Sequence, residues 1–279
     1  YEPLLPGCFH LPSPYTYRNP FDEMDGAKLA EKIAAAMVDE IEFQDPSTIA
    51  AFIMEPIQGA GGVIVPDASF MKHMRDICDR YGILMISDEV ITGFGRTGDW
   101  TGARHWGVKP DMMTIAKGIT SGYFPVGGVV LGDKVAEVFE KAGPEGSIWT
   151  GYTYSAHPVG AAAVVACLSE TLRLDTKSNA AVRGTQLYEG VKKLAEKYDI
   201  IGDVRGGHGL MMGIELVSDR AKKTPMDAAT MKRVHKATYE AGAMVRLGAH
   251  NILMSPPLVI SEAEVNVILS ALDAGFAAA

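Results

Sequence analysis

Short, uninterrupted apolar runs alternate with segments of helical periodicity, and this alternation limits the chain to a few layered folds. The helical segments cover residues 27–41 and 67–82, the second with Asp67 as its expected cap and Gly82 as its expected end. The apolar runs are TIAAFIMEP (48–56), ILMIS (83–87), DMMTIA (111–116) and PVGGVVLG (125–132). Continuously apolar strands are typical of parallel sheets buried on both faces, so the pattern predicts an α/β fold with a mostly parallel sheet.

The pattern of expected helices and strands changes after about residue 156. A long Ala/Val-rich helix is expected first, then a charged amphipathic helix through residues 189–197 and another helix near 226–241. Two further apolar runs accompany them, GLMMGIEL and NILMSPPLVI. We therefore divide the chain near residue 170 into a large α/β domain, 1–170, and a small α+β domain, 171–279.

The charge balance and the cysteines exclude several classes of protein. Lys and Arg number 26 against 34 Asp and Glu, which gives a formal charge of −8 without basic clusters. Nucleic acid and anionic membrane surfaces are therefore not expected as partners. Three widely spaced cysteines fit reduced thiols in the cytoplasm and argue against a disulfide framework or a metal site. No apolar run approaches the roughly 18 residues that a membrane span needs.

The stretch SDEVITGFGRTG contains a G-x-G-x-x-G pattern at Gly93, Gly95 and Gly98. A dinucleotide loop requires the first glycine to turn the chain directly from a strand into a helix. Here five residues separate the apolar run from Gly93, and the glycines and proline in DWTGARHWGVKP oppose a helix after Gly98. The pattern predicts a tight surface loop, and a nucleotide-dependent oxidoreductase stays as an alternative that a helix after Gly98 would support.

Two charged residues follow predicted strands directly, Asp88 after ILMIS and Lys117 after DMMTIA. Ligands of open parallel sheets bind at the carboxyl ends of the strands, so both side chains are expected on one rim. Taken singly, such a lysine is usually solvated and such an aspartate usually caps a helix. Together they indicate a lysine that forms a Schiff base and a carboxylate that stabilises a cationic partner, the two groups that pyridoxal phosphate requires.

Five motifs, in the same order along the chain, resemble the class III (omega) aminotransferases. They are EPIQGAGGVIVP (55–66), SDEVITGFGRTG (87–98), AKGITSGYFPVGG (116–128), GYTYSAHP (151–158) and SPPLVIS (255–261). The resemblance is strongest to members that use omega-amino acids or amines with pyruvate as acceptor. It implies the type I pyridoxal-phosphate transferase fold, with a partial large domain and a small C-terminal domain. It also implies a homodimer or homotetramer with active sites at the subunit interface.

The resemblance also assigns the cofactor-binding residues. Lys117 would hold pyridoxal 5'-phosphate as a Schiff base and serve as general base and acid, and Asp88 would pair with the pyridine nitrogen. Val90 would pack against the ring face. Thr153, with Tyr152 beside it, would reach the cofactor phosphate of the neighbouring subunit.

Two substrate-binding residues follow from the same resemblance. Arg246 would bind the carboxylate of the keto acid, for which a planar guanidinium is suited, although a structural salt bridge is its alternative role. Glu55 would pair with Arg246 when no carboxylate is bound. Ile91 stands where many members of the family have a glutamine that contacts the cofactor, which puts that contact in doubt.

The resemblance further implies that the family's N-terminal portion, with its phosphate loop, is absent from these residues. We therefore expect a C-terminal fragment with uncovered apolar sheet surface, which could be inactive alone. Three alternatives to amino transfer to a keto acid remain at this stage: an aminomutase or a decarboxylase of the same fold, or a truncated chain without activity.

Overall fold

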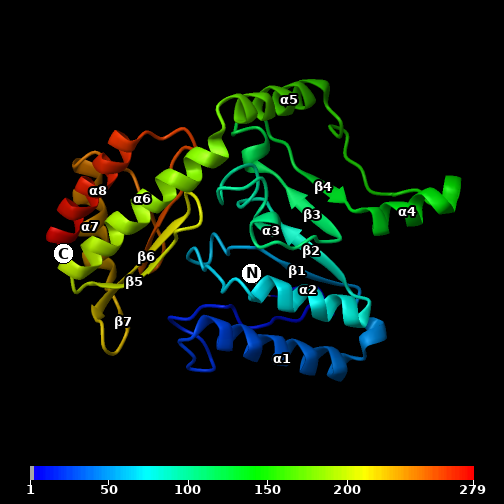
Figure 1. Cartoon of the computed structure of the whole chain (residues 1–279), viewed down its shortest axis with the longest axis horizontal. Helices are drawn as coiled ribbons and strands as arrows, with labels where there is room; N and C mark the ends of the chain where they lie inside the picture. The colour runs from blue at the N-terminus through cyan, green and yellow to red at the C-terminus, as the bar shows by residue number, and fades with distance from the viewer. Residues whose placement is uncertain (1–2) are drawn as a thin grey trace.

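Two separate sheets organise the chain, as the computed structural model of residues 3–279 shows (Figure 1). In the first sheet the order is β1-β2-β3-β4, where β1, β2 and β3 run parallel and β4 runs antiparallel to β3. The strands are β1 Ala51–Met54, β2 Leu84–Asp88, β3 Met112–Ile115 and β4 Gly128–Leu131. Each overlaps one of the predicted apolar runs, so the α/β class with a mostly parallel sheet is confirmed.

Helices α1 (Gly26–Gln44) and α2 (Phe70–Tyr81) lie side by side beneath this sheet (Figure 1). Gly82 ends α2 as predicted, in the left-handed conformation with φ 70°. The predicted cap is displaced, because Ser69 occupies the N-cap position and Asp67 accepts hydrogen bonds from the backbone and hydroxyl of Ser69 instead. This domain also has four short helices, η1 Pro46–Thr48, α3 Gly102–His105, η2 Lys117–Ile119 and η3 Gly143–Glu145, and one longer helix, α4 Asp133–Ala142.

The two faces of the first sheet differ in cover. Met85 and Ser87 of β2 are fully buried toward the side of α1 and α2. On the opposite face, Ile53 of β1 and Val129 of β4 are 57% and 58% exposed. The expectation of burial on both faces is therefore wrong for residues 3–279, because they supply a full covering layer on one side only. The uncovered apolar surface expected of a partial large domain is present.

The second sheet has the order β5-β6-β9-β8 with antiparallel pairs, and β7 pairs with β6. Helices α6, α7 and α8 pack with it around a core separate from that of the first sheet. Its elements are β5 Ile201–Arg205, β6 Met212–Asp219, β7 Thr224–Pro225, β8 Arg246–Leu247, β9 Asn251–Met254, α6 Thr176–Lys197, α7 Ala228–Glu240 and α8 Glu262–Ala277. Among residues 3–279, no helix is long and apolar enough to cross a membrane.

Helix α5 (Pro158–Arg173) leads from the first sheet into α6 (Figure 1). The proposed division near residue 170 falls inside the last turn of α5, and the chain leaves helical geometry at Leu174 and Asp175, between α5 and α6. The two separate cores support a division into two domains, which we keep as a proposal.

The glycine loop connects the two domains. The Arg96 guanidinium donates to the carbonyl oxygens of Leu210 at 3.0 Å and Pro256 at 2.6 Å, both in the second domain. Burial lowers the pKa of Arg96 to about 10, so the side chain is still charged at neutral pH. Gly98 has φ 82°, and a Cβ there would lie 3.0 Å from the Cβ of Ala181 in α6. The glycines therefore permit close packing between domains.

The same loop excludes the nucleotide-binding alternative. The next helix after Gly98 is α3, which begins at Gly102 and has four residues. A dinucleotide loop needs a longer helix that starts at the glycines themselves, because the helix amides must meet the pyrophosphate. The loop is tight, as predicted, but the predicted surface position is wrong, because Gly93, Gly95 and Thr97 are buried. The oxidoreductase alternative has no support.

A buried ionic cluster attaches the first residues of the described chain to the second sheet. Glu215 of β6 is 1% exposed and accepts hydrogen bonds from Tyr15, Arg18 and Arg205. Arg205 also donates to the Tyr15 hydroxyl at 2.7 Å and to Asp203 at 2.8 Å. Burial raises the pKa of Tyr15, which keeps its hydroxyl protonated. Each charge in the cluster therefore has a partner.

Candidate active site

Three polar side chains stand where the three parallel strands end. Glu55 follows β1, Asp88 is the last residue of β2, and Lys117 begins η2 two residues after β3. Asp88 is in register with Thr114 of β3, and the Glu89 amide donates to the Thr114 carbonyl at 2.9 Å. Since parallel strands end at a common edge, the predicted carboxylate and amine lie on the same rim.

The two residues of the acidic pair have different surroundings. Glu89 is fully buried, and its carboxylate accepts four hydrogen bonds that fix the start of α3. The four donors are the Ser87 and Thr92 hydroxyls and the Gly102 and Ala103 amides. Asp88 is partly exposed and its Oδ1 accepts from the Val90 amide at 3.0 Å. Within residues 3–279 its Oδ2 has no hydrogen-bond partner, so Asp88 is the member of the pair that can bind a cation.

The side chain of Glu55 is influenced by both other groups of the rim. Its Oε2 accepts a hydrogen bond from the Gly59 amide at 2.9 Å. Burial raises the pKa of Glu55, the Gly59 hydrogen bond and the charge of Lys117 oppose that shift, and the charge of Asp88 adds to it. Asp88 and Lys117 therefore both lie near enough to Glu55 to influence its pKa.

The backbone at Lys117 is in an unusual conformation. Its φ is 43°, in the left-handed region that residues other than glycine seldom adopt. Val63 also has a positive φ, of 53°, which is rarer still for a β-branched residue. Such strain persists only where surrounding structure enforces it, and it concentrates at functional sites. Lys117 itself is exposed at the rim.

The remaining predicted cofactor residues are dispersed. Val90 follows Asp88 and is partly exposed. Tyr152 and Thr153 are exposed in the segment between η3 and α5. Within residues 3–279, no hydrogen bond joins the side chain of Tyr152 or Thr153 to the rim residues. Their role at a neighbouring subunit's site stays a prediction.

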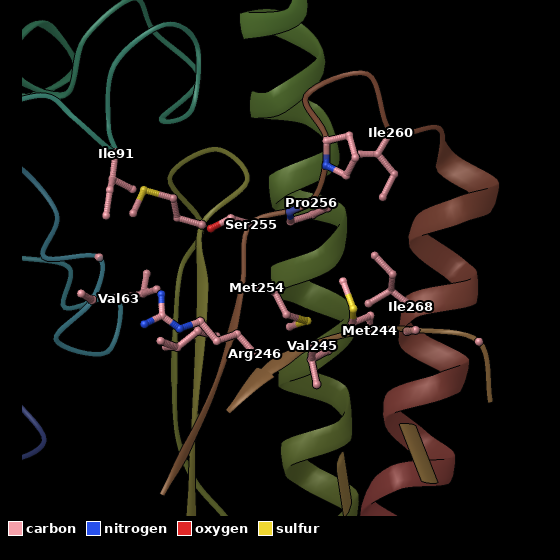
Figure 2. Close-up of a pocket in the computed structure, with 17 residues that line it drawn as sticks. Val63, Ile91, Met244, Val245, Arg246, Met254, Ser255, Pro256, Ile260 and Ile268 are labelled. Carbon is pink, nitrogen blue, oxygen red and sulfur yellow. The ribbon is translucent and has the colours of Figure 1, made fainter. Parts of the chain in front are cut away.

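A cavity of about 680 Å³ opens next to the rim, between the two domains. Ile91, three residues after Asp88, forms part of its wall together with Arg246 of β8 (Figure 2). Figure 2 shows the Arg246 side chain extended across the cavity toward Val63. Neither Lys117 nor Asp88 lines the cavity itself. The wall is mainly apolar, with residues such as Met254, so Arg246 is a conspicuous cation there.

Arg246 is available for an anionic ligand. In the described part of the chain its side chain has no salt bridge or hydrogen bond, and Glu55 is bonded to Gly59 rather than to Arg246. An unpaired guanidinium at an apolar cavity is suited to bidentate binding of a carboxylate. The proposed exchange of partners between Glu55 and a substrate therefore requires a movement of one of these side chains.

The sequence did not reveal a histidine pair between the domains. His105 of α3 and His208 of the second domain are 2.8 Å apart, Nε2 to Nδ1, and Trp106 packs against both rings. Burial lowers the pKa of His208 to about 4, and burial also lowers that of His105 despite the nearby charge of Asp99. No sequence signal connects His208 with a residue about a hundred positions earlier.

The histidine pair predicts a pH dependence of stability. Because the folded pKa of His208 lies below its ordinary value of 6.5, the unfolded chain binds more protons between about pH 4 and pH 6.5. The contribution is fully present above pH 6.5 and is lost as pH falls toward 4. Urea unfolding at several pH values measures how the free energy of unfolding changes with pH. Between pH 4 and pH 6.5 this change should be smaller for His208→Gln than for wild type. His10→Gln, at an exposed histidine, is the control. Equal slopes for all three proteins would contradict this.

The amino-acid sequence matches a known protein family. The model of the class III aminotransferases matches residues 1–275. This chain belongs to the class III aminotransferases. The resemblance expected from the five motifs is thereby confirmed.

Curated relatives of this class III aminotransferase include enzymes that use pyruvate. It is 36% identical over 285 residues to the taurine–pyruvate aminotransferase of Bilophila wadsworthia, covering 99% of this chain and 62% of that protein. The putrescine–pyruvate aminotransferase of Pseudomonas aeruginosa is 36% identical over 283 residues, covering 95% and 58%. The chain thus spans about three fifths of the length of the curated relatives it matches.

Solved structures agree with this class III aminotransferase in fold. An amine transaminase from an uncultivated Pseudomonas species, in its pyridoxal-phosphate-bound form, is 43% identical with a TM-score of 0.95, over 99% of this chain and 63% of that one. An (S)-enantioselective omega-transaminase from Thermomicrobium roseum is 40% identical with a TM-score of 0.92, covering 99% and 61%. The type I transferase fold is therefore confirmed for the part of the fold that these residues include.

Proposed function

We propose that this class III aminotransferase moves an amino group from an amine or omega-amino acid to a keto acid such as pyruvate. One observation carries the proposal: Asp88 and Lys117 stand at the ends of adjacent parallel strands, next to a cavity with an unpaired arginine. The pyruvate-using relatives support this choice of acceptor. The division of the chain near residue 170 would place the cavity between a cofactor domain and a substrate domain.

Pyridoxal 5'-phosphate is the cofactor, and it supplies an electron sink at the substrate carbon when bound. The residues present fit it. The free Oδ2 of Asp88 is available to the protonated ring nitrogen, and Val90 is placed to pack against the ring. Lys117 supplies the amine to which the cofactor attaches. Thr153 and Tyr152 would contact the phosphate from a second subunit.

Each side chain then has a defined task. Asp88 keeps the ring nitrogen charged, because a nearby carboxylate favours the cationic form. With the substrate amine joined to the cofactor in its place, the Lys117 amine would accept the proton of the substrate carbon as general base and then donate it to the cofactor carbonyl carbon as general acid. Arg246 binds the carboxylate of the keto acid. Donor and acceptor use one site in turn, so ping-pong kinetics are expected.

A homodimer or homotetramer is part of the proposal. The segment that carries Thr153 exposes large aromatic side chains, with Trp149 95% and Tyr152 80% exposed. Contiguous exposed apolar surface of this kind marks interaction sites. We also place the enzyme in the cytoplasm, where Cys8, Cys78 and Cys167, which form no disulfide in the described residues, would stay reduced.

The test is an amino-transfer assay on the protein supplied with pyridoxal phosphate. Taurine, putrescine and an aromatic amine are offered as donors, and alanine formed from pyruvate is measured. Alanine formation that requires both donor and cofactor supports the proposal. Product formation without any keto acid would instead identify an aminomutase or a decarboxylase. Absence of any reaction, together with absence of cofactor binding, would identify an inactive fragment.

The assignment of Arg246 makes a quantitative prediction. In Arg246→Gln the KM for pyruvate should rise about tenfold to a hundredfold, because a charged hydrogen-bonding partner of the carboxylate is removed. The KM for an uncharged amine donor should change little. Steady-state kinetics with both substrates measure this. Arg173→Gln, at an exposed arginine paired with Glu170, is the matched control. An unchanged KM for pyruvate would contradict the assignment.

A further inference from the structure

The hydroxyl of Thr114 is an unexplained group at the rim. Its Oγ1 is enclosed by the protein and has no hydrogen-bond partner within residues 3–279. A buried hydroxyl without a partner is unfavourable, and native proteins seldom keep one without a reason. Because the atom is enclosed by this chain, the first candidates for its partner in the working enzyme are its neighbours in the sheet.

The strand register identifies that neighbour. Thr114 lies opposite Asp88 of β2 on one side and opposite Val129 of β4 on the other. Along its own strand, the residues two positions away are Met112 and Ala116. Asp88 is the one polar side chain in this set. Residues in register on adjacent strands point to the same face of a sheet, with side chains close enough to interact.

The two side chains also have complementary needs. Oδ1 of Asp88 is occupied by the Val90 amide, whereas Oδ2 has no partner in the described chain. Thr114 has an unused donor and Asp88 an unused acceptor, on neighbouring strands. Rotation of a threonine about Cα–Cβ moves its hydroxyl from one staggered position to another.

We propose that Thr114 is a positioning residue whose hydroxyl donates to the Asp88 carboxylate when the cofactor is bound, which fixes the aim of that carboxylate at the ring nitrogen. This inference rests on the proposed function, because it assumes that Asp88 pairs with the pyridine ring. A hydrogen bond to an ionised carboxylate favours the ionised form. It also restricts the rotation of the side chain, so less freedom is lost when the cofactor binds.

The Thr114→Val variant separates this proposal from a purely structural role. Valine has the same shape, and replacing an unsatisfied buried hydroxyl by a methyl group is neutral or stabilising for the fold. The proposal expects the Kd for pyridoxal phosphate to rise about tenfold, the value of one hydrogen bond to a charged group. It also expects a smaller share of the visible absorption that belongs to the ring-protonated cofactor. Thr114→Ser, which keeps the hydroxyl, should restore both.

Two further variants make the result specific. Thr97→Val removes another buried, unpartnered hydroxyl, in the glycine loop, and should leave cofactor affinity and spectrum unchanged. In an Asp88→Asn background, Thr114→Val should lower the affinity for pyridoxal phosphate little further, because the carboxylate that accepts the hydrogen bond is already absent. Melting temperatures of all variants are recorded to confirm that each is folded.

The outcomes are distinguishable from those of the proposed function. If wild type binds the cofactor and transfers amino groups, but Thr114→Val matches it in affinity and spectrum, the positioning role is wrong and the proposed function stands. A full tenfold loss in the Asp88→Asn background as well would also overturn the positioning role. If wild type neither binds pyridoxal phosphate nor transfers amino groups, the proposed function fails and the inference fails with it.

Discussion

Lys117→Ala is expected to abolish amino transfer, with kcat reduced by at least about a thousandfold. Under the proposed function the amine has two tasks, covalent attachment of the cofactor and proton transfer at the substrate carbon, and general acid–base catalysis alone contributes about a hundredfold to ten-thousandfold. Among residues 3–279, Lys117 is the only lysine of η2, which follows the end of β3 at the rim. The positive φ of Lys117 sets the direction in which its side chain leaves the backbone.

Two measurements test this expectation. Single-turnover kinetics should show the loss of the chemical step, and denaturing mass spectrometry after borohydride reduction should show cofactor mass on wild type and none on the variant. Lys109→Ala is the matched control, since Lys109 pairs with Asp133 on the exposed surface. If the variant kept cofactor mass after reduction, another lysine would be the attachment point and the assignment would be wrong.

Glu215→Ala is expected to lower the free energy of unfolding by about 3 to 5 kcal/mol, the usual cost of removing one partner of a buried ion pair. The substitution leaves Arg18 and Arg205 without their shared carboxylate, and Arg205 is itself buried. Tyr15 also loses its acceptor. Since these contacts join the start of the described chain to β6, that segment should detach before the rest unfolds.

Urea unfolding followed by tyrosine fluorescence and far-ultraviolet circular dichroism would measure the loss. Hydrogen exchange of residues 13–19 would report the local detachment. Glu262→Ala is the matched control, because Glu262 pairs with Arg183 while remaining largely exposed. Its cost should stay below about 1 kcal/mol. Equal effects of the two substitutions would show that burial of the cluster adds nothing.

Local patterns were sufficient for much of the first domain. Continuous apolar runs predicted β1 to β4, and helical spacing predicted α1 and α2. The placement of Asp88 and Lys117 followed from one rule of parallel sheets, that strand ends share an edge. These features depend on neighbours within a few residues or on a general topological rule, which is why a sequence can reveal them.

Other features depend on contacts between distant parts of the chain. The His105–His208 pair and the contacts of Tyr15 and Arg18 with Glu215 join segments that no local pattern relates. The open face of the first sheet could not be seen in the apolar runs, because a strand's composition does not show which covering layer is present. The unused hydroxyl of Thr114 became visible only through strand register and enclosure.

Helices α4 and α8 were both missed, although α8 had a recognisable signal. Helix α8 begins after Ser261, and the Ser261 and Glu264 side chains form a capping box. The S-x-x-E spacing before an apolar run is a known start signal for helices. Helix α4 differs, because none of its residues is buried. It therefore packs no apolar face against the core.

The hydrogen bonds of Arg96 between the two domains have a consequence for the proposed substrate site. The guanidinium is held by two uncharged carbonyl groups, Leu210 and Pro256, so salt should screen the attachment very little. Pro256 follows shortly after β9, the partner strand of Arg246. Under the proposed function, the hydrogen bonds of Arg96 would hold Arg246 at a nearly fixed distance from Lys117. Ligands of different size would then be accommodated by rotation of the Arg246 side chain and not by movement of the domains.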